Sequence, residues 1–258
     1  MTGFGAEILR SIRLSRSYWV EYVSDFLLYA LGFLLLIAVF RAASAEYGPA
    51  GILSSLLGYL TWKICASVLA RVALNVSDEA RAGTLEQTFL TGTSPWAIYL
   101  SRSLGITLDY GLRGLFLGGI LALLLGVLRP IPLLAVGVFL LSLFGALGAG
   151  FGLAGVVLVY KEARGTVNLL WQALVFFTGA LAPLYHPVLS ALARLLPLTW
   201  GIESLRAIFL EQAKLADLWG SGLLPGLLLN TAVYVALGVV GFAWGERRAR
   251  QLGVLAHY

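Results

Sequence analysis

Six long apolar stretches, separated by short polar breaks, constrain this chain more than any other feature of its sequence. An apolar run of about 20 residues can cross a hydrocarbon core about 30 Å thick as an α-helix. Hydrophobic residues make up 59% of the 258 residues and charged residues 12%, so no separate soluble domain is expected. The sequence predicts an all-α polytopic membrane protein with one transmembrane domain, residues 1–258. The expected spans are Tyr22–Phe40, Ile52–Leu74, Trp96–Val127, Leu133–Tyr160, Val167–Leu184 and Leu223–Trp244.

Basic residues are distributed unevenly among the segments that join these spans. Six spans place both termini on one side, and the segments on that side carry most of the arginines and lysines. Because cytoplasmic segments of membrane proteins are enriched in these residues, both termini are predicted to be cytoplasmic, in a prokaryotic-type inner membrane. This topology accounts for the net charge of +5, and no nucleic-acid partner is expected. Ala43-Ser44-Ala45 resembles a signal-peptidase site, but the long basic region before the first span favours its retention.

Residues 1–20 form a basic amphipathic segment ahead of the first span. Trp19 falls on an apolar helical face, and Arg10, Arg13 and Arg16 lie roughly opposite. A helix of this kind can lie in the membrane interface with its apolar face toward the lipid. The alternative is a positive flank that only orients the first span.

Residues 75–95 interrupt the apolar pattern with a compact polar segment that carries helix-boundary signals. Ser77 is predicted to cap a first turn, and the two acidic residues after it suit the positive end of a helix dipole. Thr84-Leu-Glu-Gln87 has the spacing of a capping box. We therefore expect a short helix, about Leu85–Thr91, between the second and third spans. A plain cytoplasmic loop is the alternative.

Two motifs resemble those of a known family. Glu79-Ala-Arg-Ala-Gly-Thr-Leu-Glu86 resembles the Glu-x-x-x-Gly-Thr-Leu-Glu motif of type-2 ABC exporter permeases, and Pro197-Leu-Thr-Trp-Gly-Ile-Glu-Ser-Leu-Arg206 resembles their Leu-Pro-Leu-Thr-x-x-x-Glu-x-Leu-Arg segment. The length, the six-span layout and the order of the motifs agree over essentially the whole chain. Many relatives carry Ser-Gly-x-x-Phe-Pro where this chain reads Thr178-Gly-Ala-Leu-Ala-Pro183. This departure puts in doubt any substrate inferred from drug exporters.

The resemblance implies functions for three segments. In such permeases the first cytoplasmic loop is a coupling helix that docks into a groove of an ATPase subunit, and the N-terminal helix lies beside that subunit. The loop corresponds here to residues 75–95, and the expected docking residues are Asp78, Glu79, Arg81, Thr84, Leu85, Glu86 and Gln87. The family also has an external re-entrant hairpin, which corresponds to residues 185–215. Its expected helices are about Val188–Leu196 and Thr199–Gln212, with Pro197, Glu203 and Arg206 as its motif residues.

The chain contains no Gly-x-x-x-x-Gly-Lys-Ser/Thr loop, so it is not expected to be an enzyme. The resemblance assigns ATP and Mg²⁺ to a partner ATPase, and this chain is expected to hold no cofactor or metal of its own. A second permease chain, identical or homologous, is expected to complete the pathway. The predicted function is export of an amphipathic, lipidic or glycan-type substrate out of the cytoplasm.

Ionisable residues inside the expected spans are the remaining candidates, because a charge in hydrocarbon is costly and is usually paired or functional. Asp109 and Arg113 have the i,i+4 spacing of an intrahelical ion pair. Lys63 has no oppositely charged partner nearby in the sequence. It is expected either to pair with Asp109 or to line a polar pathway. An ion-coupled transporter or channel using these three residues is the alternative function, and a membrane scaffold is a third. The glycine-rich stretch Gly145–Gly152 is expected to pack helices closely, within one subunit or between two.

Overall fold

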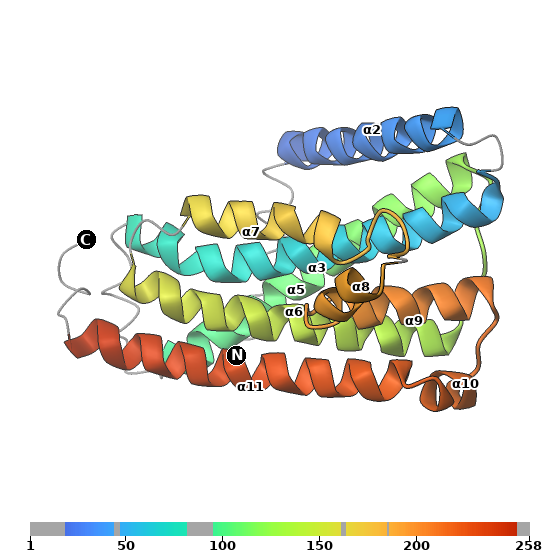
Figure 1. Cartoon of the computed structure of the whole chain (residues 1–258). Coiled ribbons are helices and arrows are strands. Elements are labelled where there is room, and N and C mark those ends of the chain that lie inside the picture. Colours follow the sequence, from blue (N-terminus) through green and yellow to red (C-terminus); the bar gives the residue numbers. More distant parts are fainter. Residues whose placement is uncertain (1–18, 44–46, 82–94, 161–163, 185, 252–258) are drawn as a thin grey trace.

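The computed structural model describes residues 19–43, 47–81, 95–160, 164–184 and 186–251. Every regular element in these segments is a helix, as the sequence predicts. The long helices α3, α6 and α11 run side by side, and α7 lies along α3 (Figure 1). The helices are α2 (Trp19–Ala43), α3 (Pro49–Arg81), α5 (Pro95–Leu124), α6 (Leu133–Val159), α7 (Arg164–Phe177), α8 (Pro187–Ala193), α9 (Thr199–Leu210), α10 (Leu215–Gly220) and α11 (Leu223–Gln251).

Within the described segments, five helices are long and apolar enough to cross a membrane: α2, α3, α5, α6 and α11. The sixth expected span, Val167–Leu184, is shorter than predicted. Its helix α7 has 14 residues, about 21 Å at 1.5 Å per residue. The chain leaves the helix after Phe177, and Gly179 takes a left-handed φ of 68°, which glycine adopts at little cost. The apolar composition of this stretch therefore overstated the length of its helix.

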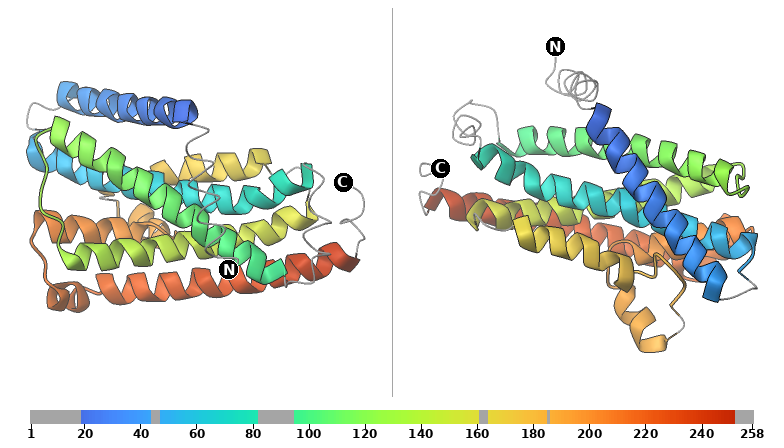
Figure 2. Two further views of the ribbon diagram at one scale, coloured as in Figure 1. Left: turned by 180° about the vertical axis from the view of Figure 1, so that it is seen from behind. Right: turned by 90° about the horizontal axis from the view of Figure 1, so that it is seen from above.

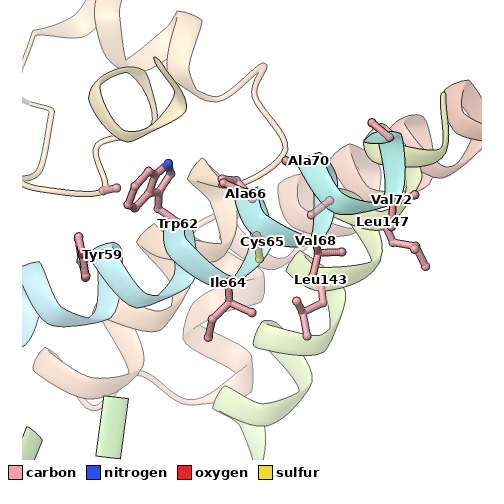
Figure 3. Packing of buried hydrophobic residues seen from close by; sticks show 14 of the residues in the cluster. Tyr59, Trp62, Ile64, Cys65, Ala66, Val68, Ala70, Val72, Leu143 and Leu147 are labelled. Atoms are coloured by element: carbon pink, nitrogen blue, oxygen red, sulfur yellow. The ribbon is translucent and has the colours of Figure 1, made fainter. Parts of the chain in front are cut away.

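The central helix is α3, whose most apolar window is 83% buried. Its small and branched side chains face α6, and Figure 3 shows Val68 beside Leu143, with Leu147 further along the same face. On the opposite side, the indole of Trp62 stacks on Trp171 of α7 with 5.6 Å between ring centroids. Because α3 is surrounded in this way, a displacement of it would be transmitted to most of the bundle.

The glycine-rich stretch of α6 packs inside the subunit, against α11. A Cβ atom at Gly148 would lie 2.7 Å from the Cα atom of Val235, and one at Gly155 would lie 2.7 Å from that of Phe242. Only residues without a side chain allow two helix backbones to approach so closely. Gly150, on another face of α6, meets Leu69 of α3 in the same way. Of the two alternatives left by the sequence, this structure has contact within one subunit.

Helix α2 lies at the edge of the bundle and crosses over α3 and α5 (Figure 2). Only 11% of its most apolar window is buried. Phe33 is its main buried anchor, with its ring centroid 4.9 Å from that of Tyr59 on α3. The Tyr59 hydroxyl donates a hydrogen bond of 3.0 Å to the backbone carbonyl of Tyr29. A few large side chains therefore attach α2 to the other helices.

Candidate functional site

Lys63 lies near the middle of α3, at the boundary with α2 and α7. Its Nζ atom is 3.0 Å from the ring centroid of Tyr29 and 5.7 Å from that of Trp171. A cation over an aromatic face is stabilised by the negative face of the ring, and more strongly where water is excluded. Among the described residues, Lys63 forms no ion pair with Asp109. Aromatic rings, rather than the carboxylate considered from the sequence, contact this ammonium group.

Asp109 and Arg113 form the ion pair that their spacing predicts. An Nη2 hydrogen of Arg113 is donated to Oδ1 of Asp109 over 2.6 Å, and both side chains are partly buried in α5. The guanidinium also lies over the Tyr110 ring, 5.6 Å from its centroid. Arg71 of α3 also lies over this ring, 5.9 Å from its centroid. The Tyr110 ring thus contacts two arginines, one on α3 and one on its own helix α5.

Several of these groups line a cavity of about 470 Å³ between α2, α3 and α5. Its volume is in the range of small-molecule sites, which combine apolar walls with a few polar groups. Besides apolar side chains, its walls include Asp25, Tyr29, Lys63, Tyr110 and Arg113. Lys63 and Arg113 thus both line this cavity. Asp109 does not line it but forms an ion pair with Arg113. The sequence analysis missed Asp25 and Tyr29, although an acid in the first apolar run was a visible signal.

At the other end of α3, the polar segment is partly integrated into the bundle. Helix α3 continues to Arg81, so Ser77 lies inside a helix and is buried. The prediction that Ser77 caps a new helix is therefore wrong. The apolar run of α3 ends earlier in the sequence than its helix does, because backbone hydrogen bonding continues through the polar residues.

Glu79 points toward α5, where it accepts a hydrogen bond of 2.5 Å from the Tyr99 hydroxyl and forms an ion pair with Arg102. Its neighbour Asp78 is exposed. The carboxylate of Glu79 is thus used inside the subunit, and sequence analysis did not identify Arg102 as its partner. The docking role stays a prediction for the whole segment, of which Thr84, Leu85, Glu86 and Gln87 lie outside the described residues, as do Arg10, Arg13 and Arg16. Trp19 is already part of α2.

Two short helices, α8 and α9, lie near the positions predicted for the hairpin, and the second motif covers the beginning of α9. Figure 2 shows α8 projecting from the bundle, whereas α9 packs against α3, α6 and α11. Arg206 of α9 is buried and donates hydrogen bonds of 3.2 Å to the backbone carbonyls of Ser54 and Ala180. It therefore joins α9 to the beginning of α3 and to the segment after α7.

Two further motif residues have structural contacts at this end. Glu203 accepts a bond of 3.2 Å from Nε of Arg194, and Pro197 is buried beside α6 and α11. Insertion of this hairpin into the membrane stays a prediction. Among the described residues, no group of three or more His, Cys, Asp or Glu side chains could hold a metal ion.

Together, the long apolar helices and the intramembrane charges define a multi-pass α-helical membrane protein. Residues 44–242 match the family model described as ABC-2 family transporter protein, and the chain belongs to this family. Both motifs noted in the sequence lie inside the matched range. Members of this family are permease subunits that normally pair with ATPase subunits. No curated protein matches the chain.

Proposed function

We infer that this chain is the membrane subunit of an ATP-driven exporter that moves an amphipathic, lipidic or glycan-type substrate out of the cytoplasm. The observation that carries the proposal is the family match over residues 44–242. The described part of the chain also includes five helices of membrane-spanning length. The ion-coupled alternative is not favoured, because the Asp109 carboxylate is already paired with Arg113. ATP and Mg²⁺ belong, in this proposal, to the partner ATPase.

The coupling segment, residues 75–95, receives force from that ATPase. Helix α3 supports this assignment because it runs without a break from Pro49 to Arg81. A push on the polar end of α3 acts on the most enclosed helix of the bundle, since a hydrogen-bonded helix moves as a unit. The exposed Asp78 and the residues that follow it present the docking surface.

The remaining features of the assembly belong to the same proposal. A second permease chain completes the pathway, both termini are cytoplasmic, and the membrane is a prokaryotic-type inner membrane. Helix α7 and the segment after it, residues 178–184, make the sixth crossing together, while α8 and α9 form the external hairpin. The buried bonds of Arg206 hold α9 to the beginning of α3, so this end of α3 would move with the hairpin.

Charge reversal tests the coupling segment directly. Glu86→Arg, alone and with Asp78→Arg, is expected to abolish co-purification with the co-expressed ATPase, or to leave its ATPase rate unresponsive to the permease in proteoliposomes. Glu211→Arg is the matched control, because Glu211 is an exposed acid beyond α9, at the opposite end of the bundle. If the double variant keeps both complex formation and coupled ATPase activity, the docking assignment is wrong.

A further inference from the structure

Two oppositely charged side chains in the cavity between α2, α3 and α5 belong to none of the ion pairs among the described residues. Lys63 and Asp25 both line it. In the described part of the chain neither forms an ion pair, although Asp25 is close enough to attract the Lys63 ammonium group electrostatically. Arg113 differs, because its charge is balanced by Asp109 over 2.6 Å. The cavity therefore holds one available cation and one available anion, near each other but not in contact.

Most of the remaining lining is apolar, and part of it faces outward at the edge of the bundle. Leu27 of α2 is 51% exposed and Phe116 of α5 is 69% exposed, and both also line the cavity. Phe26 and Ile64 continue the apolar wall inward. In a membrane, exposed apolar side chains at this level contact lipid chains. The cavity thus combines a partly buried cation, Lys63, and an exposed anion, Asp25, with a side that suits a hydrocarbon tail.

We propose that this cavity binds a zwitterionic amphiphile, with its anionic group at Lys63, its cationic group at Asp25 and its tail along Leu27 and Phe116. A purely anionic headgroup would be repelled by Asp25, and a purely cationic one by Lys63. Only a headgroup with both charges satisfies both side chains. Lys63 is partly buried whereas Asp25 is exposed, so the cost of leaving a charge without a partner falls mainly on Lys63. Tyr110 and Ser67 also line the cavity and supply hydroxyl groups.

The inference goes beyond the proposed function, because binding requires neither ATP nor the partner ATPase. Lys63 is near the middle of α3, so a headgroup at Lys63 lies deeper than the headgroups of the surrounding bilayer. A molecule held there has left the ordinary lipid layer and entered the protein.

Native mass spectrometry of the full chain in maltoside micelles measures this binding. The probes are phosphatidylcholine, phosphatidylglycerol and a cationic trimethylammonium lipid with the same two acyl chains, together with glycerophosphocholine, which has no tail. The wild-type chain is expected to retain phosphatidylcholine about tenfold better than either singly charged lipid. Glycerophosphocholine is expected to bind at least tenfold more weakly than phosphatidylcholine, because the tail contributes. Equal retention of the three lipids, or equal binding of the tail-less probe, overturns the proposal.

Neutralising each charge should reverse the preference in a defined way. Asp25→Asn is expected to lower phosphatidylcholine retention about tenfold and to make phosphatidylglycerol the preferred lipid. Lys63→Gln is expected to make the cationic lipid preferred. Lys214→Gln and Asp217→Asn are the matched controls, since both residues are exposed at α10, away from the cavity.

Folding is checked by the thermal unfolding midpoint of each variant. Asp25→Glu and Lys63→Arg keep the charges and are expected to restore the preference for phosphatidylcholine. If the folded neutral variants keep the wild-type order of preference, the two charges do not select the ligand and the proposal fails. If phosphatidylglycerol is already preferred by the wild type, the cavity is an anion site instead.

Discussion

The α6–α11 interface and the attachment of α2 join helices by different means. Along α6, Gly148 and Gly155 lie directly against the backbone of α11, and the Thr231 hydroxyl of α11 donates one hydrogen bond of 3.1 Å to the Leu141 carbonyl of α6. Helix α2 is held by Phe33 on Tyr59, by the hydrogen bond from Tyr59 to Tyr29, and by the Lys63 ammonium on the Tyr29 ring. The first arrangement brings two helix backbones into direct contact, whereas the second leaves a cavity of about 470 Å³ between the helices.

This difference indicates which part of the subunit can change. Close backbone contact has one good geometry, because close-packed surfaces deform little. A helix held by a few large side chains can move while those side chains change rotamer. We therefore expect α6 and α11 to act as a rigid body and α2 to open and close over the cavity.

The largest effect is expected at the glycine interface. Gly155→Ala places a methyl group against the backbone of α11 and should destabilise the chain by about 3 kcal/mol, the upper part of the range for overpacking. The thermal unfolding midpoint in detergent measures it. The matched control is Gly137→Ala on the same helix, where an added Cβ has no neighbour within 4 Å in the described structure. A similar loss in both variants would contradict the importance of the close approach.

A somewhat smaller effect is expected where α9 is joined to α3. Arg206→Met removes two hydrogen bonds from a buried guanidinium and should cost about 2 kcal/mol, typical of bonds made by charged groups. Arg194→Met is the control, because its ion pair with Glu203 is partly exposed and exposed pairs contribute about 0–1 kcal/mol. Chemical unfolding compares the two variants. Equal stabilities would show that Arg206 contributes no more than a surface pair.

An intermediate effect distinguishes the two possible uses of Glu79. If its ion pair with Arg102 joins α3 to α5, Glu79→Gln and Arg102→Gln should each lower stability by about 1 kcal/mol, and their combination should be less than additive. The unfolding free energies of the permease alone, without the ATPase, complete this double-mutant cycle. If the two losses of stability are strictly additive, Glu79 and Arg102 do not stabilise the subunit as a pair, and a docking role for Glu79 is favoured.

The smallest effect is expected at α2. Tyr59→Phe removes only the hydrogen bond to Tyr29, which should cost about 0.6 kcal/mol, the average for such bonds in membrane proteins. Hydrogen exchange should nevertheless speed up in α2 and stay unchanged in α6. Tyr160→Phe, at an exposed position after α6, serves as the control. Exchange that increases equally in α2 and α6 would contradict a separately moving α2.

Much of the fold could be predicted from the sequence, because membrane insertion depends on the hydropathy of successive residues. The five long helices begin within three residues of the predicted spans, although α3 and α11 continue past the predicted ends to Arg81 and Gln251. The exception is α7. Its helix ends at Phe177, just before the left-handed turn at Gly179, although the apolar residues continue beyond it. The i,i+4 pair of Asp109 and Arg113 was also predictable, since both residues lie on one helix and their distance is fixed by helix geometry.

The contacts between helices could not be predicted in this way. The sequence showed Lys63 and Asp25 inside apolar runs but not that they share a cavity, nor that Glu79 reaches Arg102 on another helix. Such pairings depend on how two helices cross, which no single segment encodes. The sequence by itself determined the membrane class, the approximate spans and the polar breaks, because these follow from local hydropathy. Only the tertiary structure decided which glycines join α6 to α11 and which charges line the cavity beside α2, because side chains distant in sequence are brought together by packing alone.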